Sequence, residues 1–413
     1  MSRRRWRSVI AGAVLMLACA QPDVAPAPAA VPVAKAPEIR IGLLVNVRHA
    51  TIGGGGAFRV SDPDEGELTA YLPGTQLDVG ASRGDVVLTG DVRPLERAVF
   101  LVEAVDSDAV MRVNGHDYQG SIELRASDSG LVVINHVSLE DYLVGVVGAE
   151  LGRRAPGDEE ALKAQAVVSR TYALRNQGRY KDRGFDLMSS VNDQVYAGQL
   201  TDNAMAAAAV RATRGEIVAV NGQPIDAFFS STCGGRTEDG TAAFAGASRP
   251  YLQSVDDLDP SGIPWCAISP RFRWTATWSG AELANTLRRT LAAEHLPGGA
   301  ATGLSAVQIG GRTATGRVAT ITLVGRGGRT VVSGQAIRRV LSPLEGGLLR
   351  STDFTLRLTR SGSQLERVDI DGRGNGHGVG MCQWGAIGRS RAGQDYRTIL
   401  GSYFPGTDVQ QAY

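Results

Sequence analysis

Few cysteines, few aromatic residues and almost no net charge set the first limits on this sequence. Its 413 residues include four cysteines and five histidines, aromatic residues make up 6%, and the formal charge is +1. So small a net charge excludes a whole-chain field that attracts nucleic acid, and we expect no nucleic-acid partner. Glycine is abundant, at 52 residues, and abundant glycine favours turn-rich β structure over a helical bundle.

An apolar run long enough to span a bilayer is also lacking. The run SVIAGAVLMLA is too short, and because it follows the basic segment MSRRRWR it predicts an export signal over residues 1–20. Two interpretations of its end stay open. LMLAC resembles a lipobox in which Cys19 is lipidated, whereas Ala18-Cys19-Ala20 also suits ordinary cleavage. Either way, we expect an exported protein of the periplasm or cell envelope that touches a membrane only through such an anchor.

The rest of the chain alternates between β and helical patterns. Residues 21–37 are rich in proline and alanine, which is typical of an extended tether. Short β-type segments separated by turns follow to residue 136 and predict mostly antiparallel structure. One helix is predicted between a cap at Ser138 and a stop at Gly152. Further helices are predicted over the ranges 156–179, 201–215, 278–296, 334–341 and 383–392, and Ser279 and Glu282 are expected to form the capping box of the helix over 278–296. The predicted fold class is α+β, with a helical core and mostly antiparallel sheets.

A series of separated motifs carries a family resemblance. SLEDYLVGVVGAEL, ALKAQAVVSRTYAL, NDQVYAG, AFFSSTCGGRTED, PYLQSVDD and GRGNGHGVGMCQWGA occur in that order. Together they resemble the sporulation stage II D / LytB (SpoIID/LytB) family of bacterial envelope proteins over roughly residues 38–407. Some members are lytic transglycosylases that cut the glycan strands of peptidoglycan, and others are enhancers that assist an amidase.

The resemblance implies a division of the chain into parts. The predicted parts are a β-rich segment at 38–136, a core with the catalytic glutamate at 137–275, a helix and hairpin insertion at 276–370 and a completing segment at 371–413.

Glu150, at the end of VVGAEL, stands where the family has its catalytic glutamate. Apolar neighbours in sequence, Val146 and Val147, suit a carboxyl whose pKa is raised. A lytic transglycosylase needs only one such group, because the sugar's own 6-hydroxyl attacks the anomeric carbon and closes a 1,6-anhydro ring. Glu140 and Asp141 are interpreted as capping and solvation groups. A solvated glutamate is the alternative for Glu150 itself.

The resemblance also implies residues that bind substrate. Arg170, Gln194 and Tyr196 match motif positions, although an ion pair for Arg170 and a core position for Tyr196 are alternatives. Ser231 and Thr232 precede a double glycine, in either a cleft-lining turn or a tight corner.

GHGVGMCQWG is predicted to be a glycine-shaped turn that brings His377 and Gln383 near the cleft that holds Glu150, where both are expected to bind or position substrate. For His377, a buried structural role is the alternative. Cys382 is interpreted as a packed thiol.

The remaining cysteines are expected to form a disulfide, Cys233–Cys266, because exported cysteines tend to pair. A zinc site of Cys233, Cys266, Cys382 and His377 is conceivable. Family members with zinc, however, carry cysteines just before the Q-x-Y motif, where this chain has none. We therefore predict no metal and no cofactor.

The sequence thus predicts an exported lytic transglycosylase that acts on peptidoglycan strands, with Glu150 as its single acid and base. The alternative is a non-catalytic protein that binds peptidoglycan and recruits a cell-wall amidase.

Overall fold

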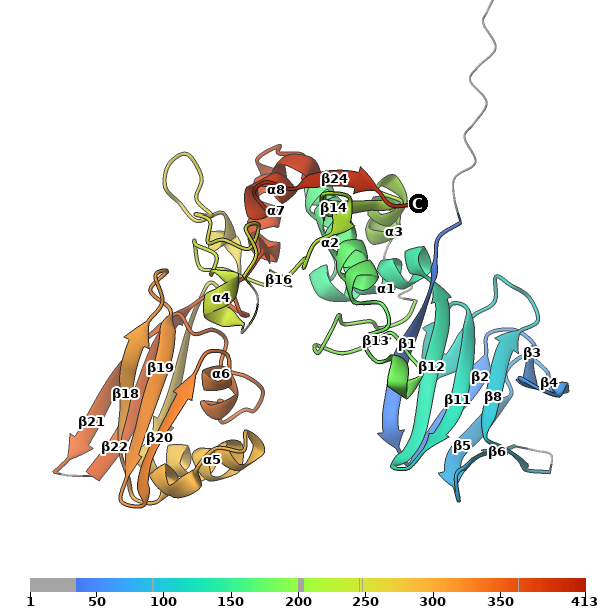
Figure 1. Cartoon of the computed structure of the whole chain (residues 1–413), viewed down its shortest axis with the longest axis horizontal. Coiled ribbons are helices and arrows are strands. Elements are labelled where there is room, and N and C mark those ends of the chain that lie inside the picture. The colour runs from blue at the N-terminus through green and yellow to red at the C-terminus, as the bar shows by residue number, and fades with distance from the viewer. Residues whose placement is uncertain (1–34, 91–92, 200–203, 245, 247, 363) are drawn as a thin grey trace, which may run out of the picture. The chain divides into compact units, whose positions relative to one another are not determined.

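The computed structural model describes residues 35–413 apart from 91–92, 200–203, 245, 247 and 363 (Figure 1). The predicted export signal with Cys19, most of the tether and the start of the helix expected over 201–215 lie outside the described residues. Every helix within the described part is too short or too polar to cross a bilayer. The residues from Ala36 to Tyr413 form one unit, and its architecture is α+β, as predicted.

Two sheets form the N-terminal β region. The larger has the order β13 (Leu187–Met188), β1 (Glu38–Val47), β12 (Gly130–Ser138), β11 (Ser121–Ser127), β8 (Val99–Ala104), β3 (Phe58–Asp62) and β4 (Gly66–Tyr71). The smaller has the order β10 (His116–Tyr118), β9 (Met111–Val113), β2 (His49–Gly54), β5 (Gln76–Ser82), β6 (Asp85–Thr89) and β7 (Leu95–Arg97). Alternate residues point into one shared core, as Val86 and Leu88 do from β6. Only the β1–β13 pair in these sheets is parallel, which confirms the antiparallel prediction.

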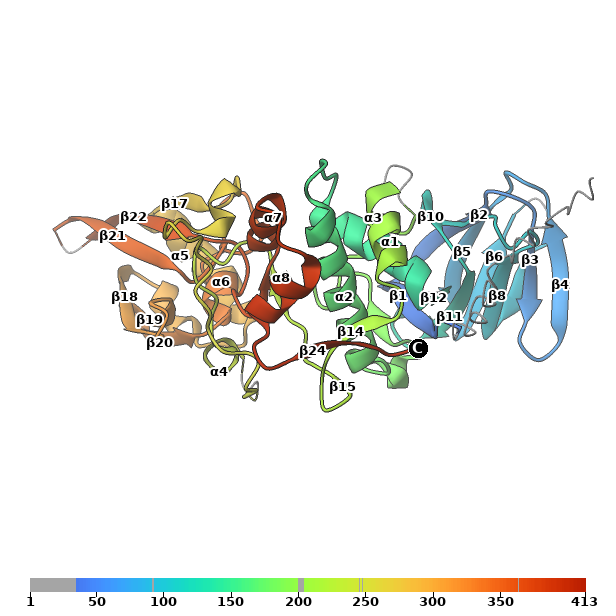
Figure 2. The ribbon, with the colours of Figure 1, turned by 90° about the horizontal axis from the view of Figure 1, so that it is seen from above.

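A group of helices follows the β region. It consists of α1 (Leu139–Leu151), α2 (Glu159–Asn176), α3 (Ala204–Ala212), α7 (Gln383–Arg391) and α8 (Tyr396–Tyr403). A small sheet of β15 (Gln223–Pro224), β14 (Glu216–Val220) and β24 (Asp408–Gln411) accompanies them. α2 contacts all four other helices of the group, and Figure 2 shows it beside them. Its small apolar residues, such as Ala164 and Val168, are fully buried and permit this close packing.

The predicted ends of α1 are confirmed. The Ser138 hydroxyl accepts a hydrogen bond from the Asp141 backbone N–H, and Gly152 follows the helix at a φ of 66°. Because α1 begins directly after β12, its length sets where its last turn lies, and Glu150 lies in that turn.

A second hydrophobic core belongs to residues 273–373. Its sheets are β17 (Arg273–Ser279), β22 (Gln364–Arg373) and β21 (Phe354–Ser361), then β18 (Leu304–Arg312), β19 (Val318–Gly325) and β20 (Gly328–Ser333). The helices α5 (Gly280–Ala293) and α6 (Ala336–Val340) pack with them, and Ser279 and Glu282 form the predicted capping box of α5.

One short parallel pairing joins distant parts of the chain. β16 (Phe229–Ser230) pairs with β23 (Met381–Cys382), so that Ser230 lies opposite Cys382. Beyond the strands, the Thr232 and Asn375 backbones also exchange hydrogen bonds. The SSTCGG and GHGVGMCQ motifs therefore lie side by side, and the start of α7 follows directly from this pairing.

Candidate functional site

A pocket of about 310 Å³ lies at the C-terminal end of α1. Its lining residues come from α1, the Ser231 turn, a loop before β17 and α7. They are Ala149, Glu150, Leu151, Gly152, Arg154, Ser231, Pro270, Arg271, Gln383, Trp384 and Ile387. Glu150 is the one carboxylic acid among these described lining residues.

Glu150 is partly buried and held by two neutral donors. The Val195 backbone N–H donates to its Oε1 at 3.0 Å, and the Gln383 side-chain amide donates to its Oε2 at 3.3 Å. Burial raises the pKa of the Glu150 carboxyl above its ordinary value of 4.5, while these two hydrogen bonds oppose the rise without cancelling it. The carboxyl is therefore kept protonated to a higher pH than a solvated glutamate.

A larger hollow, of about 740 Å³, is lined by β17, β21 and β22 and shares no residue with this pocket. Its two acids are ion-paired: Asp353 lies 3.2 Å from Arg373, and Asp371 lies 3.0 Å from Arg357. Each of these carboxylates faces an arginine, whereas Glu150 has only neutral donors, so we place the candidate site at Glu150.

The structure places the predicted residues Gln383 and Ser231 in this pocket. Gln383 touches Glu150 directly and also donates to the Gln165 Oε1 at 3.3 Å. Gln165 in turn donates to Ser169 at 3.0 Å, so a buried polar chain crosses from α2 to α7. Sequence reasoning did not assign Gln165 to the site. The available signal was an amide within the stretch ALKAQAVV, in which every other residue except Lys163 is apolar.

Arg154 and Trp384 were also missed. The Arg154 guanidinium lies 5.1 Å from the Trp384 ring centroid, and both side chains line the pocket. An aromatic face with a cation beside it suits a sugar ring that carries an anionic substituent. Trp384 directly follows Gln383 in the GHGVGMCQWG motif, and this position was a signal that it belongs to the site.

Thr232 lies outside the lining residues. It is buried, and its hydroxyl is 2.9 Å from that of Ser269. Its hydroxyl also lies 3.3 Å from that of Ser231, but only the partly exposed Ser231 lines the pocket, whereas Thr232 is buried beneath it against Ser269.

Arg170 does not line the pocket, and the expectation that it binds substrate is not supported by its position. It is fully buried in α2 and forms a bidentate ion pair with Glu140, at 2.8 and 2.9 Å. The ion-pair alternative is thus the one the structure shows. Glu140 was interpreted wrongly as a solvated capping group, because the Tyr413 hydroxyl and Arg170 both bind it in a buried position.

Gln194 and Tyr196 are buried rather than placed in the pocket. Gln194 accepts from the Tyr142 hydroxyl at 3.3 Å, and the Tyr196 hydroxyl donates to Asn135 at 3.0 Å. The two side chains anchor the segment on either side of Val195. The Q-x-Y motif therefore contributes to the site through the Val195 N–H that it aims at Glu150.

His377 is not among the described residues that line the pocket, so its position does not support the expectation that it binds or positions substrate. Its ring lies 5.1 Å from that of Phe244, and its Nδ1 accepts from the Val379 N–H at 3.1 Å. Burial, with help from the nearby Arg338 charge, lowers the pKa of His377 to about 4. These surroundings fit the alternative for His377, a neutral histidine with a structural role.

The predicted Cys233–Cys266 disulfide is absent. Both are free thiols, with their sulfur atoms 3.6 Å apart, well beyond the roughly 2.05 Å of a disulfide bond. The pairing was wrong because Cys382 and Asp257 share the same buried space, so each sulfur has more than one neighbour. His377 is not part of this group.

Comparison with known proteins agrees with this geometry. The family model described as stage II sporulation protein (SpoIID) matches residues 127–219, which include Glu150, Gln165 and Val195. A domain of unknown function, DUF8618, matches residues 266–380. The stage II sporulation protein D of Bacillus subtilis is 31% identical over 71% of this chain and 82% of its own length. The chain belongs to the SpoIID/LytB family.

Two further relatives are an uncharacterised protein and an amidase enhancer. An uncharacterised protein of Brachyspira hyodysenteriae is 34% identical over 72% of this chain and 73% of its own length. The amidase enhancer of Bacillus subtilis is 27% identical over 65% of this chain but only 40% of its own length. The likeness thus extends to a relative named as an enhancer.

Proposed function

We propose that the protein is an exported lytic transglycosylase that cleaves peptidoglycan glycan strands, with Glu150 as its single acid and base. The observation that carries the proposal is the state of the Glu150 carboxyl: partly buried in a pocket, held by two neutral donors and raised in pKa. A protonated carboxyl of this kind can protonate a leaving glycosidic oxygen.

A single acid in the pocket favours transglycosylation over hydrolysis. Hydrolysis by water generally employs a second carboxyl, and the described lining residues offer only Glu150. In the proposed reaction, Glu150 gives its proton to the glycosidic oxygen as the C–O bond breaks. The carboxylate then takes a proton from the 6-hydroxyl of the same sugar, which attacks the anomeric carbon and closes the 1,6-anhydro ring. No water is consumed, and Glu150 ends protonated as it began.

The surrounding residues have separate roles in this scheme. The Val195 N–H and the Gln383 amide hold the carboxylate in place after proton transfer. The Trp384 face supports a sugar ring, and Arg154 and Arg271 supply positive charge for the carboxylates of the strand. Because the enzyme works on the cell wall, the proposal includes export directed by residues 1–20.

The test is product analysis on purified glycan strands. Wild-type protein and Glu150→Gln are incubated with strands that carry or lack stem peptides, and products are identified by mass spectrometry. We expect 1,6-anhydromuramoyl ends from the wild type and none from the variant. Absence of such ends from the wild type on both substrates would overturn the proposal, as would undiminished products from Glu150→Gln.

A second candidate is a non-catalytic binding protein that stimulates an amidase, favoured by the relative named as an amidase enhancer. It predicts sedimentation with peptidoglycan without cleavage. It also predicts faster release of stem peptides when a cell-wall amidase is added, equally for wild type and Glu150→Gln.

A further inference from the structure

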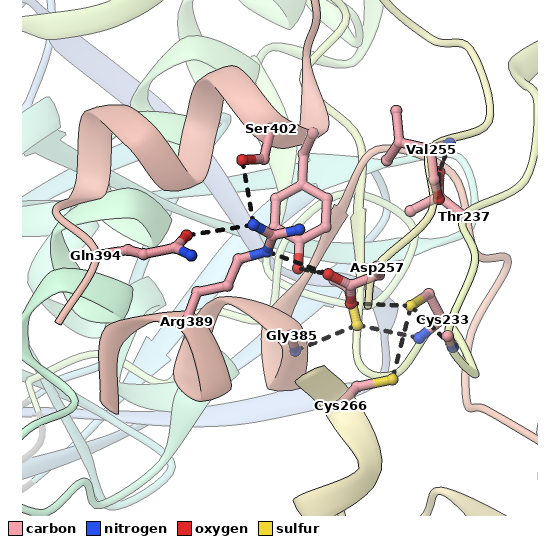
Figure 3. Close-up of polar contacts among 12 residues, drawn as sticks. Cys233, Thr237, Val255, Asp257, Cys266, Gly385, Arg389, Gln394 and Ser402 are labelled. Atoms are coloured by element: carbon pink, nitrogen blue, oxygen red, sulfur yellow. Dashed lines mark hydrogen bonds and ion pairs between the residues drawn. The ribbon is translucent and has the colours of Figure 1, made fainter. Parts of the chain in front are cut away.

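Four buried side chains meet next to the β16–β23 pairing, in which Cys382 lies. Cys233, Cys266, Cys382 and Asp257 each direct one ligand-type atom to a common point, and these atoms all lie within 4.8 Å of one another. All four residues are less than 2% exposed. Figure 3 shows the labelled members of this group, Cys233, Asp257 and Cys266, pointing toward one another.

Two distances within the group match those around a tetrahedral ion. With Zn–S bonds of about 2.3 Å, the sulfur atoms around a tetrahedral zinc ion are separated by roughly 3.8 Å. Here the Cys233 and Cys266 sulfurs are 3.6 Å apart, and the Cys233 sulfur is 3.2 Å from the Asp257 Oδ2. Three soft thiolates with one oxygen donor in this geometry favour Zn²⁺ over Ca²⁺ or Mg²⁺.

Asp257 is oriented as a ligand that binds through one oxygen. Its Oδ1 accepts from Arg389 Nε at 3.2 Å and from the Tyr403 hydroxyl at 2.8 Å, which leaves Oδ2 facing the sulfur atoms. In Figure 3, Arg389 approaches the carboxylate from the side opposite Cys233. Partners that fix the free oxygen of a ligating carboxylate are a regular part of metal sites.

Backbone N–H groups point at the sulfur atoms. Cys233 N–H and Gly385 N–H donate to the Cys382 sulfur at 3.1 and 3.3 Å, and Gly235 N–H donates to the Cys233 sulfur at 3.4 Å. Gly234 and Gly235 both have positive φ, at 85° and 105°, which lets the chain fold its N–H groups back toward the thiols. Donors arranged in this way would stabilise the thiolates of a metal-bound state.

A bound divalent ion would also have most of the charge of its ligands balanced around it. With an ion in place, three thiolates and the Asp257 carboxylate would carry four negative charges, of which the Arg389 guanidinium, 3.2 Å from Asp257, would offset one and the ion two.

We propose that Cys233, Cys266, Cys382 and Asp257 form a structural Zn²⁺ site. Binding releases the protons of the three thiols, and no other bond is made or broken. The site differs from the Cys3His set considered from the sequence, because Asp257 takes the place of His377, and it replaces the expectation that the chain binds no metal.

The site would join the segments after β16 and β23, which contribute Ser231 and Gln383 to the candidate pocket. Cys382 caps the N-terminus of α7 and directly precedes Gln383, and Cys233 follows Ser231 by two residues. Asp257 also ties the loops together through its backbone, since its N–H donates to Gly235 O and its carbonyl accepts from the Trp265 N–H. Metal bound here would hold Gln383 and Ser231 in position without touching substrate.

The experiment measures metal directly and needs no activity. A Cys19→Ser background leaves only the three clustered cysteines, so thiol titration of the denatured chain counts them without interference. The purified full-length protein is analysed for zinc by mass spectrometry and is reconstituted with Co²⁺. We expect one Zn²⁺ per chain and the intense visible absorption of tetrahedral Co²⁺ with thiolate ligands.

Matched variants locate the ion. Cys382→Ser and Asp257→Asn should lower the affinity for Zn²⁺ at least about tenfold, while Asp256→Asn, which alters the exposed neighbouring carboxylate, should leave it unchanged. Three free thiols with no zinc in the background protein would overturn the proposal. A Cys233–Cys266 disulfide with no zinc, seen as a loss of two titratable thiols, would overturn it equally. Zinc content and thiol count are both measured on the unaltered cluster, so misfolding of a variant does not affect them. Neither measurement depends on glycan cleavage, so failure of the glycan assay would not count against the zinc site.

Discussion

Two glutamates on α1 have opposite surroundings and opposite chemistry. Glu140, in the first turn, meets Arg170, the Tyr413 hydroxyl and the Gly215 N–H. These partners outweigh burial and lower its pKa. Glu150, in the last turn, has only the neutral Val195 and Gln383 donors, and burial raises its pKa. Burial alone therefore does not decide whether the pKa of a carboxyl is raised. The pKa rises at Glu150 because no cation is among its hydrogen-bond partners.

The largest expected effect is the loss of catalysis in Glu150→Gln. If Glu150 is the acid and base, the rate of anhydro product formation should fall by about 10²–10⁴-fold. Its unfolding midpoint should stay the same or rise, because the amide removes a carboxyl that is unfavourable when charged. The same substitution at Glu140 should lower the midpoint instead. If both substitutions lowered it equally in thermal melts, the contrast between the two residues would be lost.

Arg170→Met should have the next largest effect, on stability rather than on catalysis. The substitution leaves Glu140 buried without its cation, which should lower the free energy of unfolding by about 3–5 kcal/mol in urea titrations. The double variant Glu140→Gln/Arg170→Met should recover part of this loss, since no charge remains buried. A stable Arg170→Met variant with a raised KM would instead indicate that Arg170 binds substrate.

The two carboxyls should also give opposite pH slopes. The pKa of Glu140 is lowered on folding, so its stabilising contribution is present above the unfolded pKa and is lost as pH falls through the folded value. The pKa of Glu150 is raised on folding, so it weakens the fold increasingly as pH rises from the unfolded pKa through the folded value. Relative to wild type, Glu150→Gln should therefore gain stability as pH rises. Unfolding measured across pH would contradict this if the gain grew on acidification.

Gln383→Leu tests the neutral donor. The Gln383 amide lowers the pKa of Glu150, so its removal should move the alkaline limb of the pH–rate profile to higher pH. Gln165→Leu serves as the control, because Gln165 accepts a hydrogen bond from Gln383 and, within the described part of the chain, makes none to the Glu150 carboxyl. If the alkaline limb moved to lower pH instead, a group other than Glu150 would determine its position.

The smallest expected effect is that of Arg154→Gln. Loss of its stacking on Trp384 should cost about 0.5–1 kcal/mol of substrate binding and appear as a higher KM with kcat nearly unchanged. A fall in kcat at constant KM would place Arg154 in the chemical step.

Local signals predicted the elements well, because caps and periodicity act over a few residues. The Ser138 cap and the Ser279–Glu282 capping box both formed as expected. The resemblance brought Glu150 and Gln383 together correctly, since it reflects whole motifs.

Tertiary partners were harder to predict. Arg170 and Tyr196 stand at polar motif positions, and only packing decides that they face inward. Asp257 carried no local signal at all: it joins the cysteines because the β16–β23 pairing and the η2 turn (Trp265–Ile268) bring separate loops together.

The β16–β23 pairing also sets an order in time. During synthesis or transport, Glu150 emerges well before β23 and α7, so a partial chain has the carboxyl but neither its Gln383 partner nor the Trp384 wall. Such a chain has no complete pocket. The segment that holds β23 and α7 therefore postpones the proposed glycan cleavage until nearly the whole chain has been made.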